Sequence, residues 1–237
     1  MSSAAGTTAV PSVARPTLAI EESDQRFPVR RVYCVGRNYA AHAREMGKDP
    51  DREPPFFFMK PADSVVPAAG VIPYPPLTSD LHHEVELVIA IGKGGAAIEE
   101  ADAQAHVWGY AVGIDLTRRD LQGEAKAAGR PWEWGKSFDA AAPCGSLRPA
   151  SETGYPATGA IWLDVDGAQR QRGDLSEMIW SVPEIIALCS QASRLEPGDL
   201  IMTGTPAGVS PLTTGNTVTA GIAGVGEIAF EIGATSV

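Results

Sequence analysis

The feature that most constrains this chain is the segment 84–92, in which two glutamates open an otherwise apolar and largely β-branched run. His82-His83 precedes the segment and a glycine-rich stretch follows it, so the pattern predicts a β-strand. Side chains two apart on a strand share a face, so Glu84 and Glu86 point the same way, about 7 Å apart. The opposite face is an apolar row that must be buried: Val85, Leu87, Ile89 and Ile91.

Two like charges this close on a half-buried strand repel each other and lose hydration. Solvent, a basic partner or a bound cation could each relieve the repulsion. A third acid, Asp115, ends the apolar segment 106–115 just before a helix predicted at 116–128. Asp115 suits the role of a helix cap. Together with Glu84 and Glu86, however, it supplies three hard oxygen donors, a set suited to Mg²⁺ or Mn²⁺.

The histidines and cysteines do not indicate a zinc site. No H-E-x-x-H, H-x-H or C-x-x-C spacing occurs, and the three cysteines are far apart, so the ligand patterns typical of zinc are missing. We expect the His82-His83 rings beside the acids to pack or to support the ligands rather than to bind metal. The metal indicated by the sequence is therefore Mg²⁺ or Mn²⁺.

The remaining segments predict a mostly β fold with a few helices, of the α+β class. Strands and helices do not alternate regularly, which argues against a doubly wound parallel sheet. The pair Asp166-Gly167 predicts a type I′ hairpin turn. Further strands are expected at 31–36, 56–60, 106–115, 161–167, 200–206 and 226–232. Helices are expected at 37–46, 99–104, 116–128 and 178–189.

Size and composition favour one large globular domain, because the chain has 237 residues and is 44% hydrophobic. A net charge of −10 without a basic stripe argues against nucleic-acid binding. An odd number of separated cysteines favours a reducing cytoplasm, and no apolar run is long enough for a membrane span. Residues 1–28, rich in Ser, Ala, Thr and Pro, predict a flexible tail, which leaves 29–237 as a single catalytic domain.

Three further groups of polar residues suggest chemistry. His42 and Glu45 lie three apart on the predicted helix, so the carboxylate can orient the imidazole as a general base, although such pairs also occur on solvated helix faces. Lys136 lies among aromatic residues, where it either extends to solvent or meets an anion in a desolvated pocket. The loop 203–208 offers hydroxyls and amides for a carboxylate, or is only a tight turn.

Taken together, these segments resemble the fumarylacetoacetate hydrolase superfamily, and within it the acylpyruvate and fumarylpyruvate hydrolase branch. The matching pieces recur in family order from about Arg30 to the C-terminus and leave only the tail uncovered. They are the segments 33–46, 57–61, 81–87, 113–122, 135–139 and 201–209.

The resemblance implies a mixed β-roll fold and a homodimer. It implies that Glu84, Glu86 and Asp115 hold the metal, in agreement with the donor set described above. It also places a catalytic dyad, His42 and Glu45, on a lid helix near 38–47 that orders when substrate binds. Catalytic and substrate-binding positions further along the chain are implied for Arg119, Gln122, Lys136, Gly204 and Thr205.

The activity implied is metal-dependent hydrolysis of the C–C bond of a 2,4-diketo acid. Fumarylpyruvate, split into fumarate and pyruvate, is the first expectation, with pyruvate leaving as an enolate stabilised by metal and lysine charge. Two alternatives stay open: oxaloacetate decarboxylation by the same metal-enolate chemistry, and a catalytically silent metal-binding protein. A small-molecule substrate is expected in the cytoplasm, with no nucleic-acid or membrane partner, and the family suggests the gentisate pathway.

Overall fold

The computed structural model describes residues 9–11, 14–40 and 54–235, and these form a mostly β fold, as the sequence predicts. The largest sheet has eight strands and is mixed, because two parallel pairs stand among antiparallel neighbours. In order across the sheet, the strands are β4 (Phe56–Lys60), β3 (Arg31–Gly36), β15 (Asp199–Met202), β8 (Val85–Ile91), β9 (Val107–Ile114), β11 (Ala142–Cys144) and β5 (Val65–Pro67), with β12 (Arg148–Pro149) paired to β9.

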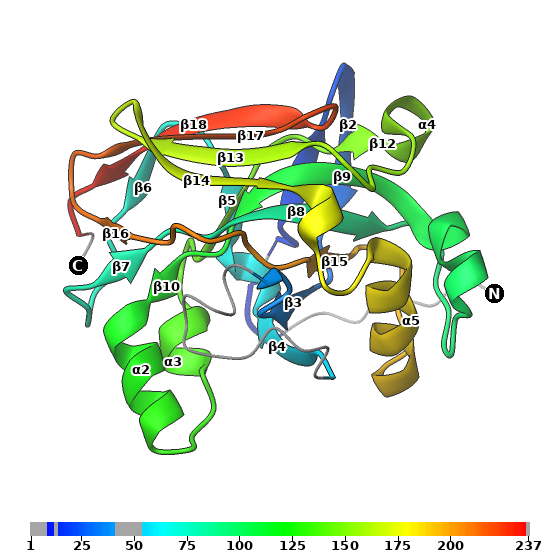
Figure 1. Cartoon of the computed structure of the whole chain (residues 1–237), viewed down its shortest axis with the longest axis horizontal. Coiled ribbons are helices and arrows are strands. Elements are labelled where there is room, and N and C mark those ends of the chain that lie inside the picture. The colour runs from blue at the N-terminus through cyan, green and yellow to red at the C-terminus, as the bar shows by residue number, and fades with distance from the viewer. Residues whose placement is uncertain (1–8, 12–13, 41–53, 236–237) are drawn as a thin grey trace.

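A second sheet of five strands lies across one face of the first (Figure 1). Its hairpin turn at Asp166-Gly167 has φ values of 52° and 74°, as the predicted type I′ turn requires. In order, its strands are β14 (Ala168–Asp174), β13 (Ala160–Val165), β17 (Thr217–Ile222), β18 (Gly226–Gly233) and β6 (Val71–Pro73). A third, small sheet consists of β10 (Thr117–Arg118), β7 (Leu81–His82) and β16 (Pro211–Leu212).

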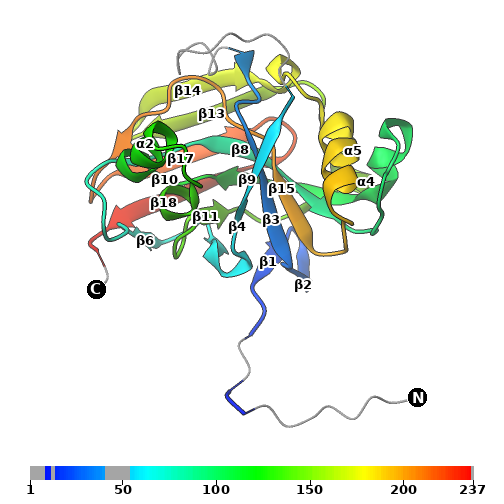
Figure 2. The same ribbon diagram turned by 90° about the horizontal axis from the view of Figure 1, so that it is seen from below.

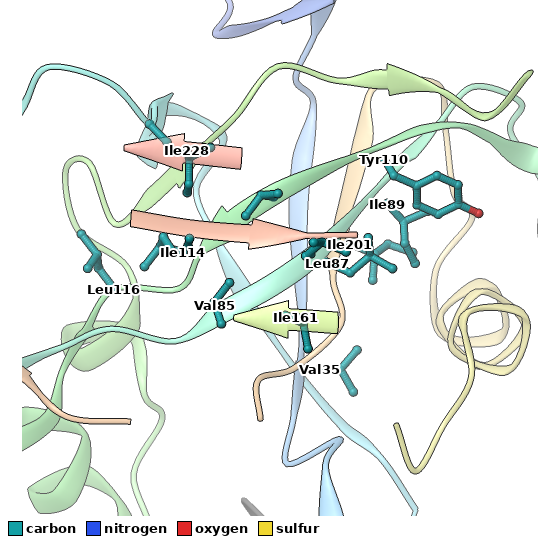
Figure 3. Packing of buried hydrophobic residues seen from close by; sticks show 14 of the residues in the cluster. Val35, Val85, Leu87, Ile89, Tyr110, Ile114, Leu116, Ile161, Ile201 and Ile228 are labelled. Carbon is teal, nitrogen blue, oxygen red and sulfur yellow. The ribbon is translucent and has the colours of Figure 1, made fainter. Parts of the chain in front are cut away.

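The main core lies between the two large sheets (Figure 3). The predicted apolar face of β8 supplies Val85, Leu87 and Ile89, none of which has exposed surface. Ile161 of β13 and Ile228 of β18 belong to the same cluster. Burying side chains of this size stabilises the fold by about 1.5–3 kcal/mol each, so this layer determines which face of β8 turns inward. The glutamates of the strand consequently point to the opposite face of the sheet.

That opposite face carries a second, smaller apolar cluster. An antiparallel hairpin of β1 (Thr17–Ile20) and β2 (Ser23–Pro28) joins it, with Leu18 paired to Phe27 and both side chains buried. The prediction of a flexible tail is therefore wrong for residues 17–28. Most of β2 is exposed and polar, so only two buried anchors mark the hairpin, which is too weak a pattern to identify from the sequence.

Helices flank the sheets (Figure 2). The predicted helix at 178–189 starts only at Val182, because Ser181 and Glu184 form a capping box that fixes its first turn. The described helices are α2 (Arg119–Ala127), α3 (Glu133–Lys136), α4 (Ala150–Thr153) and α5 (Val182–Ala192), with 3-10 turns η1 (Ala62–Ser64), η2 (Glu100–His106) and η3 (Leu175–Glu177).

The helix predicted at 37–46, with its lid near 38–47, falls outside the described residues from position 41 onward. The helix predicted at 116–128 begins instead at Arg119, because Thr117 and Arg118 pair with β7 in the small sheet. Within the described ranges, none of the helices has the length and apolar character needed to cross a membrane.

Candidate metal centre and active site

Three buried carboxylates meet where β8 begins and β9 ends. The two strands are antiparallel with Val85 opposite Ile114, and the Asp115 N–H donates to the Glu84 carbonyl oxygen at 2.8 Å. Glu86 lies one position beyond Val85 and so shares the face of Glu84. One carboxylate oxygen from each acid lies within 4.8 Å of the others. The structure thus brings together the three acids singled out in the sequence, and Asp115 does not cap α2.

These acids are almost completely removed from solvent, with exposed fractions of 5% for Glu84, 2% for Glu86 and 1% for Asp115. Burial raises the pKa of the Glu86 carboxyl well above its ordinary value, and the charges of Asp115 and Glu84 add to the shift. The Gly204 N–H, which donates to Glu86 Oε2 at 2.7 Å, opposes it. Additional positive charge would stabilise the ionised carboxylate, so the cluster is suited to a cation.

Three cationic side chains contact the same acids. Lys136 Nζ lies 2.8 Å from Glu84 Oε2 and 2.7 Å from Asp115 Oδ2. Lys60 Nζ lies 2.8 Å from Asp115 Oδ1, and the Arg119 guanidinium donates to Glu84 Oε1. Burial alone lowers the pKa of Lys136, but Asp115 and Glu84 outweigh it, and the pKa lies above its ordinary value. Of the two options left by the sequence, Lys136 is therefore the buried ammonium that meets anions.

The donor chemistry of the centre fits a hard divalent cation. Mg²⁺ prefers carboxylate oxygens at about 2.1 Å, so the observed limit of 4.8 Å between donor oxygens is slightly more than the span across one ion. Glu84, Glu86 and Asp115 could hold Mg²⁺ or Mn²⁺ after a small side-chain adjustment. Among the residues that the structure describes, no histidine or cysteine belongs to the group, so the donor set is not that of zinc.

The loop after β15 forms part of the same wall. Gly204 has φ of 93°, and a Cβ there would lie 2.7 Å from the Cβ of Asn38, so the close approach requires glycine. Thr205 is 2% exposed and accepts a hydrogen bond from Gln171 Nε2 at 2.7 Å. The loop is thus anchored on both sides while its Gly204 N–H serves a carboxylate of the centre.

A single cavity connects these groups. Arg119 Nη1 donates to Gln122 Oε1 at 2.6 Å, so the first turn of α2 presents a linked pair beside the acids. His42 and Glu45, the predicted dyad, lie outside the described residues. The predicted site residues that line the cavity are Glu84, Glu86, Asp115, Arg119, Gln122, Lys136, Gly204 and Thr205.

Comparison with the sequence models of known protein families gives a match over most of the chain. The model of the fumarylacetoacetate (FAA) hydrolase C-terminal family matches residues 31–232. The chain belongs to this family. The resemblance inferred from the sequence motifs is therefore confirmed, and the mixed sheets described above are those of a member of the family.

Two solved structures of the family superpose on nearly the whole chain. A proposed fumarylpyruvate hydrolase from Burkholderia cenocepacia is 57% identical, with a TM-score of 0.92, and the match covers 98% of this chain and 100% of that one. A fumarylpyruvate hydrolase from Pseudomonas aeruginosa, solved with Mn²⁺ and pyruvate, is 53% identical, with a TM-score of 0.94 and coverage of 96% and 100%. These similarities support the fumarylpyruvate hydrolase branch of the family.

Curated family members with another activity are also similar. The mitochondrial oxaloacetate tautomerase of Arabidopsis thaliana is 43% identical over 85% of this chain and 90% of the relative. The mitochondrial oxaloacetate decarboxylase of Dictyostelium discoideum is 42% identical over 86% of this chain and 94% of the relative. The family therefore contains both hydrolases and enzymes that act on oxaloacetate.

Lys60 also belongs to this charge cluster, although the sequence predicts no role for it. Its side chain is fully buried and, besides its ion pair with Asp115, donates to the carbonyl oxygens of Leu116, at 3.1 Å, and Lys136. The only sequence signal for it is a lysine at the end of an apolar strand, 56–60. A charged residue in that position indicates a buried partner. The sequence does not identify this partner, because the groups that Lys60 contacts lie more than fifty positions away.

Gln171 is a second residue for which the sequence analysis gave no role, and it supports the start of β8. Its Oε1 accepts from the Val85 N–H at 3.1 Å and from His83 Nδ1 at 2.9 Å, while its Nε2 donates to Thr205 and to the Pro206 carbonyl oxygen. Burial lowers the pKa of His83 to about 4, so the ring is neutral. Its contacts agree with the expected supporting role of this histidine.

Replacing Gln171 with leucine should destabilise the fold by about 2–4 kcal/mol, because several buried donors and acceptors lose their partner. Chemical denaturation of the two proteins measures the difference. The matched control is Gln169→Leu, two positions earlier on β14 and exposed, which should change stability by less than about 0.5 kcal/mol. Equal effects of the two substitutions would contradict the supporting role of Gln171.

Proposed function

We propose that the protein hydrolyses the C–C bond of a 2,4-diketo acid of the acylpyruvate class in a metal-dependent reaction. Fumarylpyruvate, giving fumarate and pyruvate, is the first candidate substrate. The observation that carries the proposal is the buried centre of Glu84, Glu86 and Asp115, which lines one cavity and is contacted by three cations. The 53% identity to a fumarylpyruvate hydrolase solved with Mn²⁺ and pyruvate supports both the reaction class and the cofactor.

In this proposal, the three acids hold Mg²⁺ or Mn²⁺. When bound, such an ion stabilises negative charge on the oxygens of a keto acid and of its enolate. Arg119 has a planar guanidinium that suits a substrate carboxylate, and Gln122 is held beside it. Thr205 and Gly204 also line the cavity.

Charge balance favours an enolate as the leaving group. The three acids and the three cations that contact them form an inner charge cluster, which consists of Glu84, Glu86, Asp115, Lys60, Lys136 and Arg119. This cluster has no net charge when all six side chains are ionised. A divalent cation adds two positive charges, which the two negative charges of a pyruvate enolate balance. Lys136 is already charged and desolvated, and its three N–H groups donate to Glu84, Asp115 and Thr117. In the reaction it would turn one of these donors to the developing oxyanion, and one such donor is worth about 3–4 kcal/mol of barrier reduction.

Water activation is assigned to the pair His42 and Glu45, by analogy with the family. Because a positioned general base contributes about 10²–10⁴-fold to rate, the His42→Ala variant should lose turnover by that factor. Its Mn²⁺ content should stay at the wild-type level, since no metal ligand is removed. Unchanged turnover in this variant would exclude the histidine from the reaction.

Oxaloacetate tautomerisation or decarboxylation is the second candidate function. The curated relatives at 42–43% identity favour it, and both reactions use the same enolate-stabilising charges. Neither requires an activated water to attack a distal carbonyl. Hydrolysis is preferred because the structures at 53–57% identity belong to the fumarylpyruvate branch.

Steady-state kinetics with Mn²⁺ on fumarylpyruvate, acetylpyruvate and oxaloacetate decide between these functions. We expect kcat/KM to be highest on fumarylpyruvate, with pyruvate and fumarate as products, and to fall to background after chelation. Higher kcat/KM on oxaloacetate would favour the second candidate. Absence of turnover on all three, despite bound metal, would favour the catalytically silent protein.

The remaining expectations stay predictions. They are a homodimer and a place in the gentisate pathway, which the family resemblance suggests, and a cytoplasmic location, which the separated cysteines suggest. Light scattering of the purified protein measures the first of these directly, and a monomeric mass would contradict it.

A further inference from the structure

Two cationic side chains line the catalytic cavity without belonging to its inner charge cluster: Arg37 and Lys126. Within the described part of the chain, no carboxylate pairs with either of them. Lys60, Lys136 and Arg119, in contrast, each contact an acid of the centre. Among the described residues, the cavity therefore combines a charge-balanced inner cluster with two outer positive charges that no described carboxylate matches.

From this arrangement we infer that Arg37 and Lys126 form a second carboxylate subsite, which binds the far end of the substrate's acyl arm. The acid cluster and Arg119 take the keto-acid end, and the two outer cations take a carboxylate at the other end. The inference deepens the proposed function, on which it rests for the identity of the substrate. It commits the enzyme to acylpyruvates whose acyl group ends in a carboxylate.

Helix α2 supplies the length scale for this subsite. Arg119, Gln122 and Lys126 are spaced i, i+3 and i+7, so they lie along one face of the helix. Seven residues span about 10 Å at the α-helical rise of about 1.5 Å per residue. An extended seven-carbon chain such as that of fumarylpyruvate is roughly 8 Å long from end carbon to end carbon, given bonds of about 1.5 Å. The backbone positions of Arg119 and Lys126 are thus separated along the helix axis by a distance comparable with the length of such a diacid.

Aromatic residues that line the cavity pack against Arg37. Its guanidinium carbon lies 5.2 Å from the centroid of the Phe56 ring, and that ring meets Trp132 edge-on at 5.1 Å. A Cβ on Gly36 would lie 2.0 Å from the Phe56 ring, so only glycine admits this packing. A guanidinium stacked on a ring keeps its in-plane N–H donors available for a carboxylate.

The backbone at Arg37 is also unusual. Its φ is 60°, a left-handed conformation that costs energy in a residue other than glycine. Such conformations are found where the surrounding structure imposes them, often at ligand-binding sites. Here the conformation accompanies a side chain that lines the cavity beside Phe56, Phe58 and Trp132. A flat, conjugated arm would lie against these rings before reaching the outer cations.

The test uses two ligands that differ only in the far carboxylate and cannot undergo diketone hydrolysis: 2-oxoheptanedioate and 2-oxoheptanoate. Calorimetry on the Mn²⁺-loaded wild-type protein should give at least about tenfold tighter binding of the diacid, since a charge-assisted hydrogen bond is worth about 1.5–3 kcal/mol and 1.4 kcal/mol is tenfold. Arg37→Gln should reduce this preference to less than threefold. Lys126→Gln, on an exposed helix surface, should reduce it in part without affecting the fold.

The matched control is Arg130→Gln, which removes an exposed cation four residues beyond Lys126 that does not line this cavity. It should leave the diacid preference unchanged. Equal binding of the two ligands to the wild type, or a preference that survives both Arg37→Gln and Lys126→Gln, would overturn the subsite. If the preference depends on these residues while fumarylpyruvate is not hydrolysed, the subsite stands and the proposed function fails.

Discussion

The Lys136→Met variant is expected to bind Mn²⁺ more tightly than the wild type and to turn over substrate about 10²–10³-fold more slowly. The two effects have opposite signs because this ammonium bridges Glu84 and Asp115. It repels a dication at the same carboxylates, so its removal strengthens metal binding. It also donates to the oxyanion of the leaving group, and loss of one such donor raises the barrier by about 3–4 kcal/mol.

Stability provides a third readout for Lys136→Met. Removing one partner of a buried ion pair costs about 3–5 kcal/mol, and here Arg119 and Lys60 still compensate part of the charge. The metal-free variant should therefore lose stability by about 3 kcal/mol. Excess Mn²⁺ should restore it, since a ligand that binds only the folded state stabilises that state.

Calorimetric Mn²⁺ titration, steady-state kinetics and denaturation with and without metal measure the three effects. Lys136→Arg is the matched control, because it keeps the charge and should keep metal affinity near the wild-type value. Weaker Mn²⁺ binding by Lys136→Met would mean that the lysine supports the metal site rather than competes with it. Such a result would remove the charge-balance argument for an enolate leaving group.

The sequence predicts those parts of the centre that depend on local patterns. The alternation of acidic and apolar residues over 84–87 places Glu84 and Glu86 on one face of the strand and apolar side chains on the other. The position of Asp115 at the end of an apolar strand marks it as a candidate third donor. These patterns need no knowledge of the fold, and in the structure one oxygen of each of the three acids lies within 4.8 Å of the others.

Other parts depend on pairing between distant segments and leave no local pattern. Lys60 bonds to a carbonyl 76 positions away, and Gln171 bonds to His83 across 88 positions. Each looks in the sequence like an ordinary polar residue on a strand. The sequence also left Lys136 with two possible surroundings, because the aromatic residues beside it suit both a surface lysine and a buried one. The packing of α3 against α2, β10 and β4 decides between them.

The Glu86→Gln variant should lose at least about 100-fold in Mn²⁺ affinity while keeping its stability within about 1 kcal/mol of the wild type. Even the loss of a residue behind a metal ligand typically costs 10–100-fold in affinity, and Glu86 is proposed as a ligand itself. Among the described residues it forms no ion pair, and its resolved bond is the one accepted from the Gly204 N–H. A glutamine oxygen can accept that bond, so the fold loses little.

Glu86 is the most informative of the three acids, because Glu84 and Asp115 also hold Lys136 and their substitution would disturb metal and ion pairs together. Turnover of Glu86→Gln should be low at limiting Mn²⁺ and should recover in part when the metal is raised, since the chemistry of the lysine and arginine is intact. Glu227→Gln, an exposed acid on β18, should change neither property. Wild-type Mn²⁺ affinity in Glu86→Gln would show that the buried acids are a structural charge cluster, and the metal-dependent reaction would have to be abandoned for this cavity.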